Sequence, residues 1–449
     1  MHDDRKLVEE RIEDLRERLI GKEYVTLTKL NVEAWKAPDE PVPFAEAASQ
    51  QYEPFPVGTW WGPAWSTWWL RLDGILPDDA PRERVELRVD LGFSGDWAGN
   101  QSEGLVYTCD GVPLKGLNPM NRTVPLTFGT IAEQLEQEGS PLVAADGSVR
   151  LMVEAAANPN HGEDMAKYGD KATMPIEPMW QFKAAELVTR NDDVWHLQLD
   201  LEVLDGLMRE LPVDSTWRAT LLRGLERAAD VVDQGSIEEQ AAAARAVLAP
   251  LLNSGPHGSA QRMTAVGHAH IDSAWLWPIR ETRRKVVRSL SNVVALADEY
   301  PDFHFACTAP QHLEWLKEDA PMVFERMREA IQRGQWHMVG GTWIEPDANL
   351  PGGEAMVRQL TSGLRWLREE LDVTTDCLWL PDSFGYSGAL PQIAKLAGMR
   401  WFFTQKMNWN QTNTLPHHTF WWEGIDGTRI WTHFPPVDCY DSILSPDQV

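Results

Sequence analysis

The sequence predicts a multidomain protein of the α/β plus β class, in which an N-terminal antiparallel β-sandwich is followed by a helical linker and an α/β domain. Its 449 residues, of which 43% are hydrophobic, are enough for two or three domains with cores of their own. Short β-like runs broken by Gly, Pro, Asn and Asp fill much of residues 41–201, whereas strand-like and helix-like segments alternate from residue 262 onward. Such alternation is typical of parallel βαβ units.

An amphipathic helix is predicted over residues 5–19. Its apolar residues recur at the spacing of one helix face, and Gly21 follows as a stop signal. These apolar residues are Val8, Ile12, Leu15 and Leu19. We expect residues 1–40 to form a structural helical arm.

Residues 41–201 are predicted to form the antiparallel β-sandwich. The runs that indicate strands are residues 67–75, 84–93, 104–111, 150–157 and 194–203. The segment 103–119 is compatible with carbohydrate binding, and a packing or dimerisation role fits it at least as well. A sandwich fold by itself does not specify a function.

Residues 202–258 are predicted to be a helical linker, in which Ser236 and Glu239 match a capping box ahead of an alanine-rich run. The stretch NSGPHGSAQ then breaks the pattern, and the α/β domain is expected over residues 259–449. Its predicted strands are residues 263–267, 303–308, 336–341, 377–382 and 400–405, and its predicted helices are residues 281–299, 320–333, 353–370 and 388–397. Asp426 and Gly427 then indicate a hairpin turn.

Metal-capable side chains follow the first of these strands. His268, His270 and Asp272 alternate along an extended segment, so all three are expected to project to one side. His and Asp suit zinc and similar divalent ions, and Asp382, which ends another apolar run, could complete such a site. The alternative is that these polar residues cap a loop. We interpret His268 as a supporting residue rather than a ligand, because ligands need hydrogen-bonded supports.

Other polar residues also fall at the carboxyl ends of the predicted parallel strands, where α/β folds place their ligand sites. They are Gln311, Glu345, Asp347, Lys406 and His433. Glu345 and Asp347 have a second interpretation, as caps of the helix that begins near Gly353. The pattern predicts a functional site at this end of the sheet.

The motif GHAHIDSAWLWP, followed about 110 residues later by LWLPDSFGYSGALPQI, resembles the glycoside hydrolase family 38 α-mannosidases, particularly their cytosolic-type subgroup. The resemblance implies that His270 and Asp272 are metal ligands and that Asp382 is both a metal ligand and the catalytic nucleophile. It implies one divalent ion, with zinc as the first candidate and calcium or cobalt as alternatives. The implied reaction is retaining hydrolysis of terminal α-D-mannosyl residues from oligosaccharides.

The same resemblance implies a set of substrate-binding residues. Trp275 corresponds to the aromatic platform under the mannose ring, and Lys406, Tyr440 and Asp441 fall where the family places polar substrate contacts. Lys406 departs from the arginine of Golgi-type relatives. Two other functions remain open: a metal-dependent carbohydrate deacetylase on a similar barrel, and a non-catalytic sugar-binding protein.

The family fold implied by the resemblance is a seven-stranded (β/α) barrel, whereas about six parallel strands are counted before Val449. We therefore expect a barrel that is incomplete at its C-terminal end. The family's acid/base aspartate and the histidine that completes its metal site have no counterpart in this sequence. We expect this chain alone to be a poor α-mannosidase or none.

The composition disfavours several classes of partner. With 67 acidic and 41 basic residues the formal charge is -26, which opposes binding to nucleic acid or to anionic membranes. The four cysteines lack disulfide or zinc-knuckle spacing, and no apolar run is long enough for a signal peptide or a membrane span. We expect a cytoplasmic enzyme whose partner is a mannose-containing oligosaccharide, and a homo-oligomer is left open.

Overall fold

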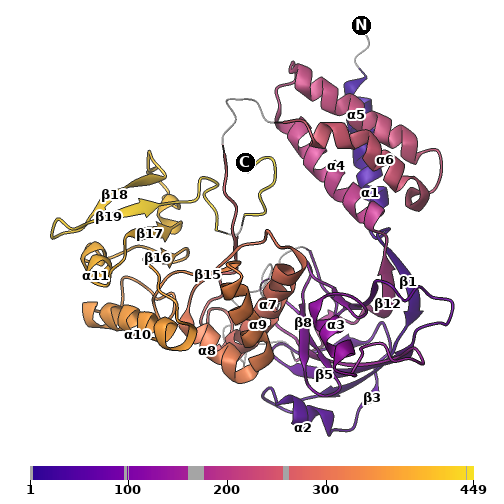
Figure 1. Cartoon of the computed structure of the whole chain (residues 1–449), viewed down its shortest axis with the longest axis horizontal. Coiled ribbons are helices and arrows are strands. Elements are labelled where there is room, and N and C mark those ends of the chain that lie inside the picture. The colour runs from indigo at the N-terminus through magenta and orange to yellow at the C-terminus, as the bar shows by residue number, and fades with distance from the viewer. Residues whose placement is uncertain are drawn as a thin grey trace.

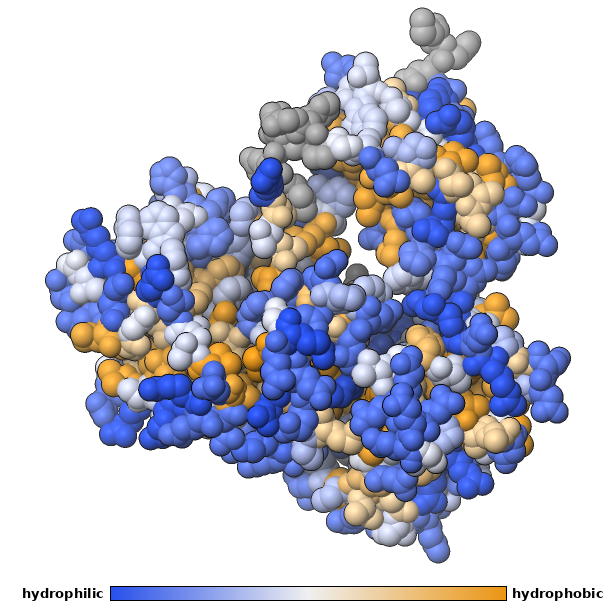
Figure 2. Space-filling view, viewed as in Figure 1, coloured by the Kyte–Doolittle hydropathy of each residue, from blue (hydrophilic) through white to orange (hydrophobic). Residues whose placement is uncertain are grey.

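The computed structural model describes residues 4–95, 99, 101–159, 176–255, 262–440 and 442–448. A helical bundle and an α/β part both adjoin a β-sandwich (Figure 1). The bundle stands above the sandwich in this view, and the α/β part lies to its left. Figure 2 shows hydrophilic residues over most of the visible face, with apolar residues in scattered patches. Such a surface agrees with the large number of charged residues.

The sandwich consists of two antiparallel sheets that enclose one apolar core. The first sheet has the order β1 (Tyr24–Lys29), β12 (Ala184–Arg190), β6 (Val85–Asp90) and β9 (Thr123–Pro125). The second has the order β3 (Glu53–Pro54), β2 (Asn31–Lys36), β5 (Thr67–Ile75), β10 (Ser148–Ala156), β7 (Glu103–Thr108) and β8 (Pro113–Leu117). A small sheet of β4 (Trp60–Trp61) and β11 (Trp180–Gln181) and the helices α2 (Phe44–Ala48) and α3 (Thr130–Gln137) complete this part. The predicted sandwich is confirmed.

The segment that contains β1 and β2 differs from the predicted helical arm. These strands extend the two sheets, because β1 pairs with β12 and β2 pairs with β5. Val32 and Ala34 alternate with polar residues along β2 and pack against the sandwich core. Within residues 4–40, which the structure describes, only α1 (Arg5–Leu19) is helical, and its buried residues are the four that the sequence predicted.

The helical bundle is formed by α1 together with α4 (Asp192–Glu210), α5 (Thr216–Val232) and α6 (Ile237–Leu252), which share one apolar core. Ser236 caps α6, since its side chain accepts a hydrogen bond from the amide of Glu239, as the sequence predicted. No helix among the described residues is both long and apolar enough to cross a membrane.

The prediction of a strand at residues 194–203 was wrong, because this segment lies within helix α4. The run alternates apolar and polar residues, but its buried apolar positions also recur at helical spacing. These positions are Val194, Leu197, Leu201, Leu204 and Met208. Asn191 caps the helix by accepting hydrogen bonds from the amides of Asp193 and Val194. Packing of this helical face against α1, α5 and α6 decides between the two periodicities.

The α/β part contains two blocks of parallel strands. The first block is β13 (Gly267–His268), β14 (Phe305–Cys307) and β15 (Trp336–Met338), and the second is β16 (Cys377–Leu380), β17 (Trp401–Thr404) and β19 (Arg429–His433), edged by the antiparallel β18 (Thr419–Glu423). The helices are α7 (Ile279–Glu299), α8 (Pro310–Asp319), α9 (Pro321–Gln332), α10 (Gly353–Leu371) and α11 (Leu390–Leu396), and a 3₁₀ turn covers Lys406–Asn408. The amide of Gly340 donates to the carbonyl of Cys377 and joins the two blocks.

The alternating βα order is as predicted. As expected, the described strands do not close into a barrel, and the parallel strands among them number six. Two elements differ from the prediction. The strand predicted at residues 263–267 is short and begins at Gly267. The helix predicted at residues 320–333 is preceded by a further helix, α8, and Pro321 begins the second helix because proline favours the first helical turn. The predicted hairpin around Gly427 joins β18 and β19.

Helix α7 packs directly on the sandwich. A Cβ atom on Gly116 of β8 would lie 2.5 Å from the carbonyl oxygen of Arg288, so only glycine allows this approach. Buried ion pairs span the same interface. Arg288 contacts Glu281 at 2.6 Å and Glu103 of β7 at 2.9 Å, and Lys285 also contacts Glu103. Asn158 of the sandwich donates to Glu281 at 2.8 Å.

We expect the substitution Glu281→Gln to lower the free energy of unfolding by about 3–5 kcal/mol, because it leaves the buried Arg288 without its nearest anionic partner. Burial would raise the pKa of Glu281, but Arg288 and Arg284 outweigh it and lower the pKa to about 2. A lowered pKa in the folded state means that Glu281 stabilises the fold above pH 4.5, and that this contribution is lost as the pH falls from 4.5 towards 2.

Urea denaturation at pH 7 and between pH 4.5 and 2.5 measures both effects. The matched control is Glu370→Gln, which removes the exposed ion pair with Lys317 and should cost less than about 1 kcal/mol. Equal costs for the two variants would contradict the stabilising role of the buried network.

Candidate active site and metal centre

A cavity of about 320 Å³ opens at the carboxyl ends of the parallel strands. Its lining includes His270, Asp272, Trp275, Glu345, Asp382 and Phe384. His270 follows β13 by two residues, and Asp382 follows β16 by two residues, so the two parallel blocks deliver their side chains to one place. The position agrees with the usual location of ligand sites in parallel α/β folds.

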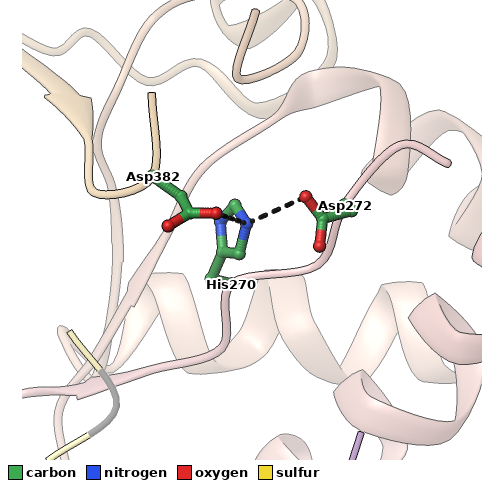
Figure 3. A group of neighbouring side chains, drawn as sticks. All are labelled: His270, Asp272 and Asp382. Atoms are coloured by element: carbon green, nitrogen blue, oxygen red, sulfur yellow. Dashed lines mark hydrogen bonds and ion pairs between the residues drawn. The ribbon is translucent and has the colours of Figure 1, made fainter. Parts of the chain in front are cut away.

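Three of the predicted residues converge in this cavity (Figure 3). The Nε2 atom of His270 lies 3.4 Å from Oδ1 of Asp272 and 3.5 Å from Oδ2 of Asp382. One ligand atom of each residue lies within 4.8 Å of the others. Tetrahedral zinc with bonds of about 2.1 Å separates neighbouring ligand atoms by about 3.4 Å. The donor set and its spacing therefore fit a divalent ion.

The imidazole of His270 is oriented by Glu345. Its Nδ1 atom lies 2.7 Å from Oε2 of Glu345, and Oε1 of Glu345 accepts a hydrogen bond from the hydroxyl of Thr308 at 2.6 Å. A proton on Nδ1 satisfies this contact and leaves the lone pair of Nε2 facing the two aspartates. Both carboxylate oxygens of Glu345 are thus engaged in holding the ring.

The charges around His270 favour a cation at this position. Burial would lower the pKa of His270, but the Glu345 and Asp272 carboxylates outweigh it and raise the pKa to about 10. Burial would likewise raise the pKa of Glu345, yet the neighbouring His270 keeps it below its usual value. A divalent ion bound at Nε2 would take the place of the proton there, beside the carboxylates of Asp272 and Asp382.

Asp382 has a second cationic neighbour in Lys406. The Nζ atom of Lys406 lies 2.8 Å from Oδ1 of Asp382, and the side chain of Lys406 is buried. The same ammonium group lies 3.4 Å from the ring centroid of Trp409 and 5.3 Å from that of Tyr440. Lys406 therefore contacts the cluster directly. The family resemblance implies that this residue also contacts the substrate.

Of the other three predicted substrate-binding residues, the structure describes Trp275 and Tyr440. Trp275 lines the cavity with 49% of its surface exposed, and its ring packs edge-on against Trp277 at 5.5 Å. The ring of Tyr440 lies 5.3 Å from that of His270. Asp441 lies outside the described residues. The roles of these residues in substrate binding remain predictions.

The other polar residues at the strand ends do not join the cluster. The Nδ1 atom of His268 is 2.9 Å from the carbonyl oxygen of Ala306, and its ring packs against Trp379, which agrees with a supporting role. Asp347 holds a turn ahead of α10 by accepting hydrogen bonds from two backbone amides. Gln311 accepts from the indole of Trp343, and His433 contacts Thr419.

The sequence analysis missed two supporting residues. Thr308, which fixes Glu345, ends the predicted strand 303–308 and could have been found by the strand-end argument. Thr282, on α7, contacts the backbone of Asp272 at 3.1 Å. No pattern in the sequence distinguishes Thr282 from other helical threonines.

Residues 260–447 match the glycosyl hydrolases family 38 N-terminal domain, and residues 27–188 match the alpha-mannosidase jelly roll domain. The chain contains the N-terminal domain of glycosyl hydrolase family 38. The family resemblance seen in the two motifs is therefore confirmed. The jelly roll match begins within β1, in agreement with the strands that replace the predicted arm.

The chain is similar to several curated alpha-mannosidases. It is 39% identical to Alpha-mannosidase 2C1 of Mus musculus and 38% identical to that of Homo sapiens, in each case over 91% of this chain and 37% of the relative. It is 34% identical to the Alpha-mannosidase of Saccharomyces cerevisiae, over 84% of this chain and 34% of the relative. The chain thus spans little more than a third of the length of these relatives.

Proposed function

We propose that this chain holds the mannose-binding and metal-binding part of a retaining α-mannosidase that removes terminal α-D-mannosyl residues from oligosaccharides. The observation that carries the proposal is the convergence of His270, Asp272 and Asp382 in one cavity of a family 38 domain. The names of the relatives support it. We further propose that the six parallel strands belong to a (β/α) barrel.

The proposed ion is zinc, held by His270, Asp272 and Asp382. One imidazole and two carboxylates suit zinc or cobalt better than calcium, which prefers oxygen ligands. When bound, the ion would supply positive charge beside Asp382 and would attract the sugar hydroxyls. Glu345 keeps the ring of His270 directed towards the two aspartates.

We propose that Asp382 is the nucleophile and that Trp275 supports the apolar face of the sugar. The Nζ atom of Lys406 lies 2.8 Å from Oδ1 of Asp382 and places a positive charge beside the proposed nucleophile. The exposed indole of Trp275 presents an aromatic surface to the cavity. Lys406, Tyr440 and Asp441 are proposed to contact sugar hydroxyls.

A retaining glycosidase also needs an acid about 5 to 5.5 Å from its nucleophile. Two carboxylates of the cavity lining are poor candidates for this role. Glu345 has both oxygens engaged with His270 and Thr308. Hydrogen bonds from the amides of Leu350 and Asn349 keep the pKa of Asp347 below its usual value, so it is ionised and a weak proton donor.

We propose a cytoplasmic enzyme that meets mannose-containing oligosaccharides. Among the described residues, no disulfide bond joins any of Cys109, Cys307, Cys377 and Cys439, which supports a reducing compartment. The formal charge of -26 favours a neutral substrate over an anionic one.

Hydrolysis of an aryl α-mannoside tests the proposal. We expect at most slow turnover by this chain, which a chelator abolishes and zinc restores, with the α-anomer of mannose as the first product. A fluorinated mannosyl substrate should leave a covalent adduct on Asp382, which peptide mass spectrometry would locate. Release of acetate from acetylated sugars without such an adduct would favour the deacetylase alternative. Mannose binding without turnover at every metal concentration would favour a sugar-binding protein.

A further inference from the structure

The segment between Asp272 and helix α7 has an unusual backbone. Ala274 has φ +84°, in the left-handed region that non-glycine residues adopt only at an energetic cost. This strain lies two residues after Asp272 and one residue before Trp275, and all three residues line the cavity. Some other interaction must therefore hold the segment in this conformation.

The hydroxyl group of Thr282 supplies that interaction. It accepts a hydrogen bond from the amide of Ala274 at 3.1 Å and donates one to the carbonyl of Asp272 at 3.1 Å. The indole of Trp277 also contacts it, at 3.1 Å, and lies 3.3 Å from the same carbonyl. The hydroxyl thereby uses its one donor and both acceptor positions, and Thr282 is completely buried.

The helical turn that carries Thr282 is held in place by contacts outside the cavity. Its neighbour Glu281 is held by Asn158 at 2.8 Å and by Arg288 at 2.6 Å, in the buried network between α7 and the sandwich. The first turn of α7 is thus attached to a separate part of the molecule. A rigid support of this kind can hold a strained loop against relaxation.

We propose that Thr282 is a positioning residue, which holds the segment 272–277 so that the carboxylate of Asp272 faces His270 and Asp382. The inference rests on the proposed metal site. Loss of the hydroxyl removes the partner of the Ala274 amide and one of the two donors to the Asp272 carbonyl. The segment then relaxes, and the ligand carboxylate loses its fixed direction.

Zinc titration by calorimetry of the whole chain and its variants tests this role. Thr282→Val keeps the shape of the side chain and should weaken zinc binding about 10- to 100-fold, as expected for residues that orient metal ligands. Thr282→Ser restores the hydroxyl and should bind within about threefold of the unmodified chain, which a purely steric role would not explain. The matched control is Thr361→Val on α10, whose hydroxyl bonds only to its own helix.

Hydrogen exchange provides a second readout. The amide of Ala274 should exchange faster in Thr282→Val and stay protected in Thr282→Ser. Unchanged zinc affinity in a folded Thr282→Val chain overturns the inference while leaving the metal site intact. Absence of zinc binding by the unmodified chain overturns both proposals together.

A third variant keeps the inference testable if Thr282→Val does not fold. Trp277→Phe removes the indole donor to the Asp272 carbonyl and the Thr282 hydroxyl and keeps an aromatic ring at this position. A smaller but measurable loss of zinc affinity supports the inference, and an unchanged affinity in this variant overturns it.

Discussion

Replacing Asp382 with Asn is expected to abolish mannoside hydrolysis, with a loss in kcat of roughly 10⁴-fold or more. The substitution removes the proposed nucleophile and a charged metal ligand together, while the carboxamide keeps the size of the side chain. It also removes the anionic partner of Lys406, which lies 2.8 Å away. Steady-state kinetics with an aryl α-mannoside and zinc titration of the same variant measure the two losses separately.

Two comparisons make this expectation specific. Trp275→Ala should mainly raise KM, because it removes a stacking surface and leaves the reacting groups in place. Asp376→Asn, which lies just before β16 and pairs with Arg400 on the surface, should leave both kinetic constants unchanged. A loss in kcat for Trp275→Ala as large as that for Asp382→Asn would contradict the assigned roles.

Elements with one strong periodicity were predictable from the sequence. Helix α1 begins and ends as predicted and buries the predicted side chains. Helix α7 begins two residues before the predicted start and ends at the predicted residue. In such segments the local apolar pattern and the tertiary packing agree, so neither overrides the other.

Segments whose pattern fits two periods were not predictable. The run at residues 194–203 alternates like a strand and also places Val194, Leu197 and Leu201 on one helix face. Only its packing against the rest of the bundle selects the helix. Strands β1 and β2 were missed for a related reason, since their place depends on pairing with β12 and β5 far along the chain.

The candidate site was partly predictable for geometric reasons. The spacing of His270 and Asp272 and the strand-end position of Asp382 indicated a common site, and the structure brings the three together. Their role as metal ligands remains a prediction. The supports of the cluster were not predictable, because Glu345 meets His270 across 75 positions of the sequence. Two interpretations had been open for Glu345, and its contact with His270 does not resemble a helix cap.

Replacing His270 with Ala is expected to abolish measurable zinc binding and also to destabilise the fold by about 3 kcal/mol. The second effect arises because Glu345 is nearly buried, with 10% of its side chain exposed, and His270 is its cationic partner. Without the imidazole, the carboxylate keeps only the hydrogen bond from Thr308. Urea denaturation and zinc calorimetry on the same variant measure stability and binding independently.

The double substitution His270→Ala with Glu345→Gln separates the two roles of His270. A neutral amide removes the uncompensated charge, so the double variant should regain at least half of the lost stability and should still bind no zinc. Glu345→Gln alone keeps the imidazole and should weaken zinc binding about 10- to 100-fold, because the ring loses its charged support. If the double variant were as unstable as His270→Ala, the loss would come from the space left by the imidazole, and the charge of Glu345 would not be its cause.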